Sequence, residues 1–99
     1  MEKMNENTIG RFGHLREKYL HEYRKDEYLE MALQGEIPEY LKLVDDEAGH
    51  FYSQTVDALM VAHGIDDKLK ASDPIKWNGL ANNARACARE IVIGELIGE

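Results

Sequence analysis

Cysteine is almost absent from this chain of 99 residues, because Cys87 is the only one. A single cysteine excludes a disulfide within the chain, and an unpaired thiol is typical of a reducing compartment. No run of apolar residues reaches the length that a signal peptide or a membrane-spanning helix needs, and the first residues are polar. We therefore expect a cytoplasmic protein that is neither secreted nor inserted in a membrane.

Proline is scarce as well, with two copies, and serine and threonine are few. The segments between the turn signals are rich in Leu, Ala, Glu, Lys and Met, which lose little side-chain freedom in a helix. Strands have no segment in which to form. The sequence predicts an all-α fold in which residues 1–8 are a flexible N-terminus and residues 9–99 form a single helical domain.

Two short helices are expected first. One spans residues 9–23, although Gly10 and Gly13 each cost about 1 kcal/mol relative to alanine and delay or weaken its start. The next begins at residue 25 or 26 and ends before Gly35, which supplies a left-handed residue. Its apolar side is expected to hold Tyr28, Leu29, Ala32 and Leu33.

Two long helices follow. One is expected over residues 37–63, with Pro38 in its first turn and Gly64 at its end. After a short turn capped by Asp66, the pair Asp73-Pro74 starts the last helix. Its seam should comprise Trp77, Ala81, Ala84, Ala88, Ile91 and Glu95. The expected architecture is a small antiparallel helical bundle of about five helices, two of them long, with the first two packed across the long pair.

Basic residues are too few to balance the acids, because 19 Asp and Glu stand against 12 Lys and Arg and give a net charge of -7. Such a surface repels phosphate and anionic lipid, so nucleic acid and membranes are poor partners. Residues 1–50 carry twelve of the acids and seven of the bases. The run Asp45-Asp46-Glu47, with Glu36, Glu39 and Asp57 near it, is either a solvated face or a patch for a basic partner.

Metal-binding patterns are incomplete. His14, Glu17 and His21 share one helix face, and Glu47 and His50 form a single Glu-x-x-His pair, but no second cluster completes either site. We expect these residues to form solvated polar faces. The sequence predicts neither a metal nor any other cofactor.

Catalytic patterns are missing too. Cys87 lies beside the expected seam, where a free cysteine usually behaves as a small buried hydrophobe, and no histidine follows His63 to activate it. No glycine-rich phosphate loop follows a strand. We expect no catalytic residues and no enzymatic activity.

Three asparagines in the last expected helix need an explanation, because asparagine is a poor helix former. Buried asparagines that fix helix register are one explanation, and a partner or ligand site is the other. The candidate interaction residues are Trp77, Asn78, Asn82, Asn83, Arg85 and Arg89.

A family resemblance is carried mainly by the C-terminal stretch Trp77-Asn78-Gly79-Leu80-Ala81-Asn82-Asn83-Ala84-Arg85, continued by Glu90-Ile91-Val92 and Glu95-Leu96-Ile97. It resembles the signature of the TnpV family of transposon-encoded proteins, and from Ile9 onward earlier segments follow the same order. The chain departs from that pattern at Asn78, where an apolar residue is usual, and at Gly98, where an aromatic one is. The resemblance implies an accessory protein of a mobile element, and it transfers no activity and no functional residue.

Three functions fit these observations. The leading expectation is a non-enzymatic accessory protein that uses an acidic helical surface to bind a protein partner, such as a recombinase or a nuclease, and that forms a homodimer. The second is a small DNA-binding factor of the excision type, acting through basic residues of the first two helices, namely Arg11, Arg16, Lys18, Arg24 and Lys25. The third is an acidic inhibitor that mimics the charge of nucleic acid.

Overall fold

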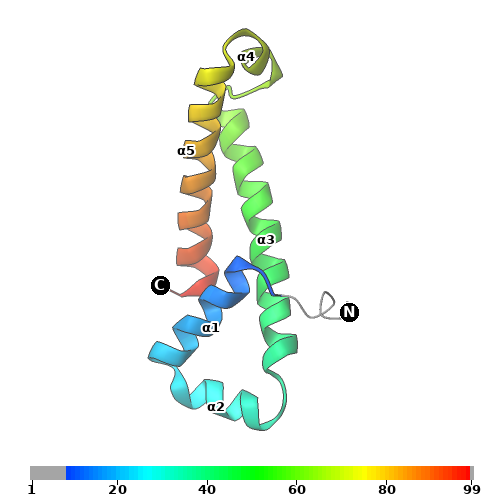
Figure 1. Cartoon of the computed structure of the whole chain (residues 1–99), viewed down its shortest axis with the longest axis vertical. Helices are drawn as coiled ribbons and strands as arrows, with labels where there is room; N and C mark the ends of the chain where they lie inside the picture. The colour runs from blue at the N-terminus through cyan, green and yellow to red at the C-terminus, as the bar shows by residue number, and fades with distance from the viewer. Residues whose placement is uncertain (1–8, 99) are drawn as a thin grey trace.

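Helices form nearly all of the part of the chain that the computed structural model describes, residues 9–98 (Figure 1). The elements are α1 (Arg11–Tyr23), α2 (Lys25–Leu33), α3 (Ile37–Ala62), α4 (Asp67–Ser72) and α5 (Pro74–Val92), and a π-helical turn, η2 (Ile93–Ile97), continues α5. Within this part there is no strand, so the predicted all-α fold with five helices is confirmed. The predicted flexible segment, residues 1–8, lies outside the described residues.

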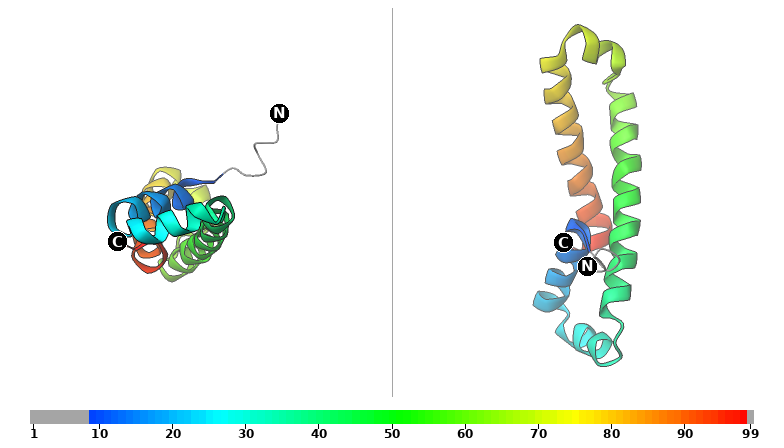
Figure 2. Two further views of the ribbon diagram at one scale, coloured as in Figure 1. Left: turned by 90° about the horizontal axis from the view of Figure 1, so that it is seen from below. Right: turned by 45° about the vertical axis from the view of Figure 1, so that its right-hand side comes forward.

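The two long helices, α3 and α5, run antiparallel side by side and form a hairpin that α4 closes at one end (Figures 1 and 2). Gly64 stops α3 because it adopts φ +67°, which disfavours residues with a side chain. The carboxylate of Asp66 accepts the N–H of Leu69 at 2.9 Å and caps α4. Asp73 caps α5 by accepting the N–H of Lys76 at 3.2 Å. These predicted boundaries are confirmed.

Helix α1 crosses the hairpin near its other end and completes a first hydrophobic cluster. The buried members of that cluster are Phe12, Ala48, Val92 and Ile97. Gly13 is buried at the crossing, and its N–H donates to Asp45 Oδ1 at 2.9 Å. A Cβ at this position would come within 3.2 Å of the Leu41 carbonyl oxygen, so glycine permits the close approach of α1 to α3.

A second cluster lies near α4 and contains no residue of α1. Its buried residues are Ile65, Ala81 and Ala84, flanked by Leu59, Met60, Trp77 and Leu80. Only α3, the turn after it and α5 contribute, so this half of the hairpin is a single layer of helices. The Cα radius of gyration of 17.0 Å exceeds the value of about 13 Å expected for a compact domain of this length.

Helix α2 corrects one expectation. The predicted packing across the long pair holds for α1, but α2 lies at the tip of the molecule and has no buried residue. Leu29 and Leu33 of its predicted apolar side are 59% and 88% exposed. Tyr28, which belongs to the predicted side, is half-buried, and so is Met31, which does not, because α2 touches its neighbours along one narrow edge.

The seam of α5 also differs from the prediction. Val92 is fully buried, whereas Ile91 is 38% exposed and Glu95 is exposed. From Ala84 onward the buried positions advance in steps of four, which turns the seam away from Ile91. The π-helical turn then adds a residue to the helical repeat and brings Ile97 into the core.

Candidate functional site

The asparagine-rich part of α5 faces solvent. Asn78, Asn82 and Asn83 are all exposed, so the explanation that buried asparagines fix the helix register is wrong. Asn78, Asn82, Arg85 and Arg89 follow at spacings of four, three and four and share one side of α5. Arg85 Nη1 donates to Asn82 Oδ1 at 3.1 Å, while Asn83 lies apart from this row.

Trp77, also a predicted interaction residue, belongs to the second cluster and is half-buried. The Lys70 ammonium lies 4.7 Å from the centre of its ring, a cation–π contact between α4 and α5. Its indole N–H is buried and has no acceptor among the described residues, which costs about 1 to 3 kcal/mol. The side chain therefore packs α4 on α5 more than it presents a surface.

A groove of about 390 Å³ opens between α3 and α5 in the single-layer half of the hairpin. It is lined by Leu59, His63, Ile65, Leu80, Asn83, Ala84 and Cys87. Sequence reasoning missed it, because a groove between two helices depends on the crossing of α3 and α5 and not on the periodicity of either.

Cys87 borders this groove and is exposed, which corrects the expectation of a small buried hydrophobe. Cys87 and His63 both line the groove, although α4 and the first part of α5 separate them in the sequence. Within the described residues no hydrogen bond links the two side chains or orients the imidazole of His63. A thiol that a histidine activates needs a hydrogen bond to the imidazole and a further group that orients the imidazole.

The acidic residues are concentrated on α2, α3 and the connection between them. Residues 25–62 hold nine acids and two bases, while the rest of the chain holds ten of each, so these residues carry the whole net charge of -7. Asp45 turns toward α1, and the other eight acids are exposed. We call these eight the acidic surface: Asp26, Glu27, Glu30, Glu36, Glu39, Asp46, Glu47 and Asp57.

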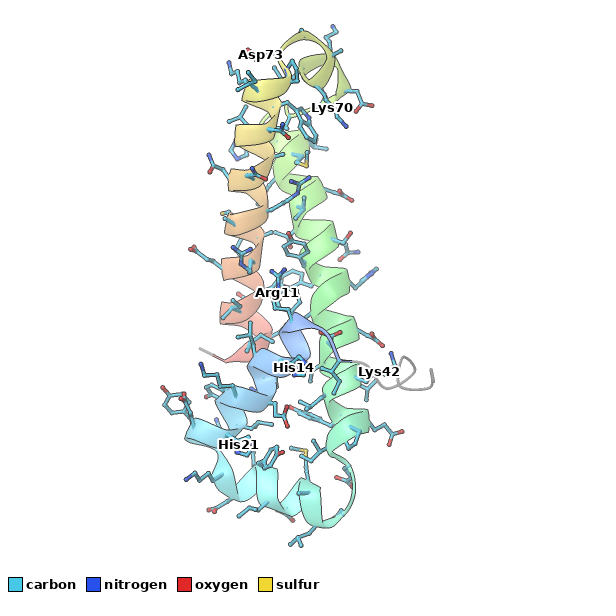
Figure 3. All side chains as sticks on the ribbon, viewed as in Figure 1. Arg11, His14, His21, Lys42, Lys70 and Asp73 are labelled. Carbon is cyan, nitrogen blue, oxygen red and sulfur yellow. The ribbon has the colours of Figure 1, made fainter. Side chains whose placement is uncertain are left out.

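A polar cluster joins α1 to α2 where the sequence offered His14, Glu17 and His21 as a metal pattern. Glu17 Oε2 accepts the Tyr28 hydroxyl at 3.1 Å, and Glu17 Oε1 lies 3.9 Å from His14 Nδ1. The ring of His21 lies 4.0 Å from that of Tyr28, and Figure 3 shows both histidines along α1. Partial burial and the hydrogen bond to the Glu17 carboxylate raise the pKa of Tyr28. In the described part of the chain no three potential ligands gather around a metal position.

Arg16 of α1 is committed to the fold. Its Nε donates to the Tyr40 hydroxyl at 3.0 Å and its Nη1 donates to the Ile97 carbonyl at 2.8 Å. The guanidinium also lies 5.3 Å from the centre of the Tyr19 ring. One side chain thereby ties α1 to the start of α3 and to the end of the last helix.

None of the helices in the described residues combines the length and apolarity needed to cross a bilayer. No curated protein and no solved structure matches the chain. The family model described as transposon-encoded protein TnpV matches residues 1–97, nearly the entire sequence. That match includes the α5 segment that carried the resemblance in the sequence. The chain belongs to the TnpV family of transposon-encoded proteins.

Proposed function

We propose that this TnpV protein is a non-enzymatic accessory protein of its transposon and binds a basic protein partner through the acidic surface. The family supplies the genetic setting. The observation that carries the proposal is the location of the net charge: residues 25–62 account for all of it, and eight of their nine acids are exposed. A concentrated field of one sign steers an oppositely charged protein and raises its association rate.

Helix α2 adds an apolar component to this surface. Asp26, Leu29, Glu30 and Leu33 share one side of α2, because they follow at spacings of three, one and three. The two leucines are mostly exposed, so a partner that covers them removes apolar area from water. Charges around an apolar centre are the arrangement of a protein interface, and the acids favour a partner with basic residues at its rim.

The DNA-binding alternative loses one of its main residues. Arg16 donates from Nε to Tyr40 and from Nη1 to Ile97, and these two bonds hold its guanidinium against the fold and away from a phosphate partner. Helix α2, which would follow α1 into a groove of DNA, carries Asp26, Glu27 and Glu30, which repel phosphate. The inhibitor alternative uses the same acidic surface and differs only in the partner, which would be a nucleic-acid-binding enzyme.

The test is capture of partners from a host that carries the element, at moderate salt and after nuclease treatment of the lysate. One variant combines Glu30→Gln, Glu39→Gln and Glu47→Gln in the acidic surface. The control combines Glu22→Gln, Glu90→Gln and Glu95→Gln, which are exposed acids outside the acidic surface and change the net charge by the same amount.

The wild type and the control should retain the same basic protein. The acidic-surface variant should bind it about tenfold more weakly, since exposed ion pairs contribute about 0.2 to 1 kcal/mol each. A retained nuclease whose activity falls when the protein binds it would favour the inhibitor alternative. Equal retention by both variants, or loss of the partner after nuclease treatment, would contradict the proposal.

A further inference from the structure

A second pocket, of about 420 Å³, lies where α3 ends and the chain turns into α4. Its apolar lining comes from Met60, Val61 and Ile65. Ile65 is buried, while Val61 is 83% exposed, so the fold leaves apolar area of this pocket in water. Only Ile65 also lines the groove between α3 and α5, and the two sites are therefore separate.

Two carboxylates line the same pocket. Asp57 precedes its apolar residues on α3, and Asp66 follows them in the turn before α4. Asp57 and Gly64 both line the pocket and are seven residues apart, so the pocket extends about 10 Å along the helix axis. It combines an apolar centre with acids that come from both sides of that centre in the sequence.

The charge of this pocket is not balanced locally. No basic residue lines it in the part of the chain that the structure describes, and neither Asp57 nor Asp66 forms an ion pair there. Helix α3 ends at the pocket without a basic residue in its last turn. The C-terminal end of a helix carries a negative partial charge, which adds to that of the carboxylates. The pocket therefore favours an occupant that is positively charged and partly apolar.

We propose that this pocket anchors the basic partner protein by binding an apolar side chain that two basic side chains flank. The apolar side chain contacts Val61 and its neighbours, and the basic ones pair with Asp57 and Asp66. An apolar anchor with charged groups around it is a common centre of a protein interface. The inference rests on the proposed function, because Asp57 belongs to the acidic surface and the pocket extends that surface toward α4.

A synthetic peptide tests the pocket directly. The probe is acetyl-Lys-Ala-Leu-Ala-Lys-amide, whose alternate side chains share one face when the chain is extended, with the two lysines about 13 Å apart. The peptide at millimolar concentration is added to the full chain labelled with nitrogen-15. The amide signals of residues 57–66 should shift most. Peptides with Glu in place of both lysines, or with Ser in place of the leucine, should bind at least about threefold more weakly.

Isosteric variants separate the pocket from the rest of the acidic surface. The pocket variant combines Asp57→Asn and Asp66→Asn, and asparagine still caps α4 because its side-chain oxygen also accepts the N–H. The control combines Glu39→Gln and Glu47→Gln, which are exposed on α3 outside the pocket and change the net charge equally. The pocket variant should bind the peptide about fivefold more weakly, and the control should stay within about twofold of the wild type.

The apolar contact is tested without any change of charge. Val61→Ser should weaken peptide binding about threefold, because it removes apolar area from the contact. Ile75→Ser is the matched control, since Ile75 is 84% exposed on α5 and does not line the pocket. It should bind as the wild type does. Circular dichroism must show equal helix content in all the variants.

Equal weakening by the pocket variant and its control would show that the peptide follows overall charge, and would overturn the anchoring site. Shifts that centre outside residues 57–66, or no binding of the peptide, would overturn it too. The capture experiment judges the proposed function separately, because none of the acids changed there lines the pocket. A captured basic protein without peptide binding therefore refutes the anchoring site alone. Failure to capture a basic protein contradicts the proposed function, whatever the peptide does.

Discussion

At the scale of single residues, Arg16 does the most to join distant parts of the chain. It bonds to Tyr40 at the start of α3 and to Ile97 at the end of η2, positions 24 and 81 residues away. Hydrogen bonds that involve a charged group contribute about 1.5 to 3 kcal/mol. The sequence indicates only an arginine within an apolar stripe and gives no means of naming its acceptors.

Replacing this arginine should lower stability. We expect Arg16→Ala to reduce the free energy of unfolding by about 2 kcal/mol, because it leaves the Ile97 carbonyl and the Tyr40 hydroxyl without their donor. Arg11→Ala, at an exposed position of the same helix, should change it by less than about 0.5 kcal/mol. Urea denaturation measures both. Equal values for the two variants would show that the Arg16 contacts contribute nothing.

Tyr28 should make the contact between α1 and α2 depend on pH. Its pKa is raised above the ordinary value of 10.0, so the protonated phenol is favoured in the folded state. Its stabilising contribution is complete below the ordinary pKa and is lost as the pH rises through the raised one. In a tyrosinate absorbance titration, Tyr28→Phe should remove the raised-pKa component that Tyr28 contributes to the wild type, and Tyr23→Phe should keep it. If the raised-pKa component persists in Tyr28→Phe, its assignment to Tyr28 is wrong.

The residues that were predictable from sequence are those whose partners are near in the chain. Asp66 and Asp73 cap helices three residues ahead of the N–H groups that they bind, so the local pattern identified them. Burial of Cys87 and of the asparagines depends on which side of α5 other helices cover. The local sequence pattern does not determine that side. The expected burial of Cys87 was therefore wrong, and so was the buried one of the two explanations offered for the asparagines.

At the scale of elements, the contact between α1 and α3 depends on a glycine that helix propensity alone would disfavour. Gly13→Ala should destabilise the protein by about 1 to 3 kcal/mol, because the new Cβ would press on Ile9, Asp45 and the Leu41 carbonyl oxygen. Gly49→Ala on α3 should instead stabilise it by up to about 1 kcal/mol, because nothing lies within 4 Å of the added Cβ. Thermal unfolding distinguishes the two signs. Stabilisation by both changes would contradict the close approach.

Periodicity predicted where the helices lie better than how they pack. The bounds of α3, α4 and α5 follow from Pro38, Gly64, Asp66 and Asp73, whose effects are local. The exposed side of α2 was predicted as buried, because an apolar stripe does not say whether another element reaches it. Ile91 was misplaced because the buried positions of α5 advance in steps of four from Ala84 to Val92. Glu95 was misplaced because the π-helical turn after α5 changes the helical repeat.

At the scale of the whole molecule, the chain is elongated, with extents of 55 by 33 by 17 Å. A long shape with a single-layer half buries few residues for its length, which leaves the groove between α3 and α5 open to solvent.

The uneven charge is the other property of the whole molecule. Residues 25–62 are strongly acidic and the remainder of the chain is neutral overall. The total net charge does not show this difference. The sequence located the excess in the N-terminal half, but α1 lies in that half and is rich in bases. The fold shows that the charge belongs to α2 and α3 and that nearly all of it faces solvent.

The central claim is that the acidic surface binds a basic protein, and zero-length carbodiimide cross-linking in lysate of a host that carries the element tests it most directly. This reagent joins carboxylates to lysines in contact, and mass spectrometry identifies both residues. We predict cross-links from residues 26–57 to lysines of another protein, weakened by high salt because the attraction is screened. Cross-links to other proteins that arise only from the carboxylates of α4 and α5, or no cross-link to any other protein, would contradict the claim.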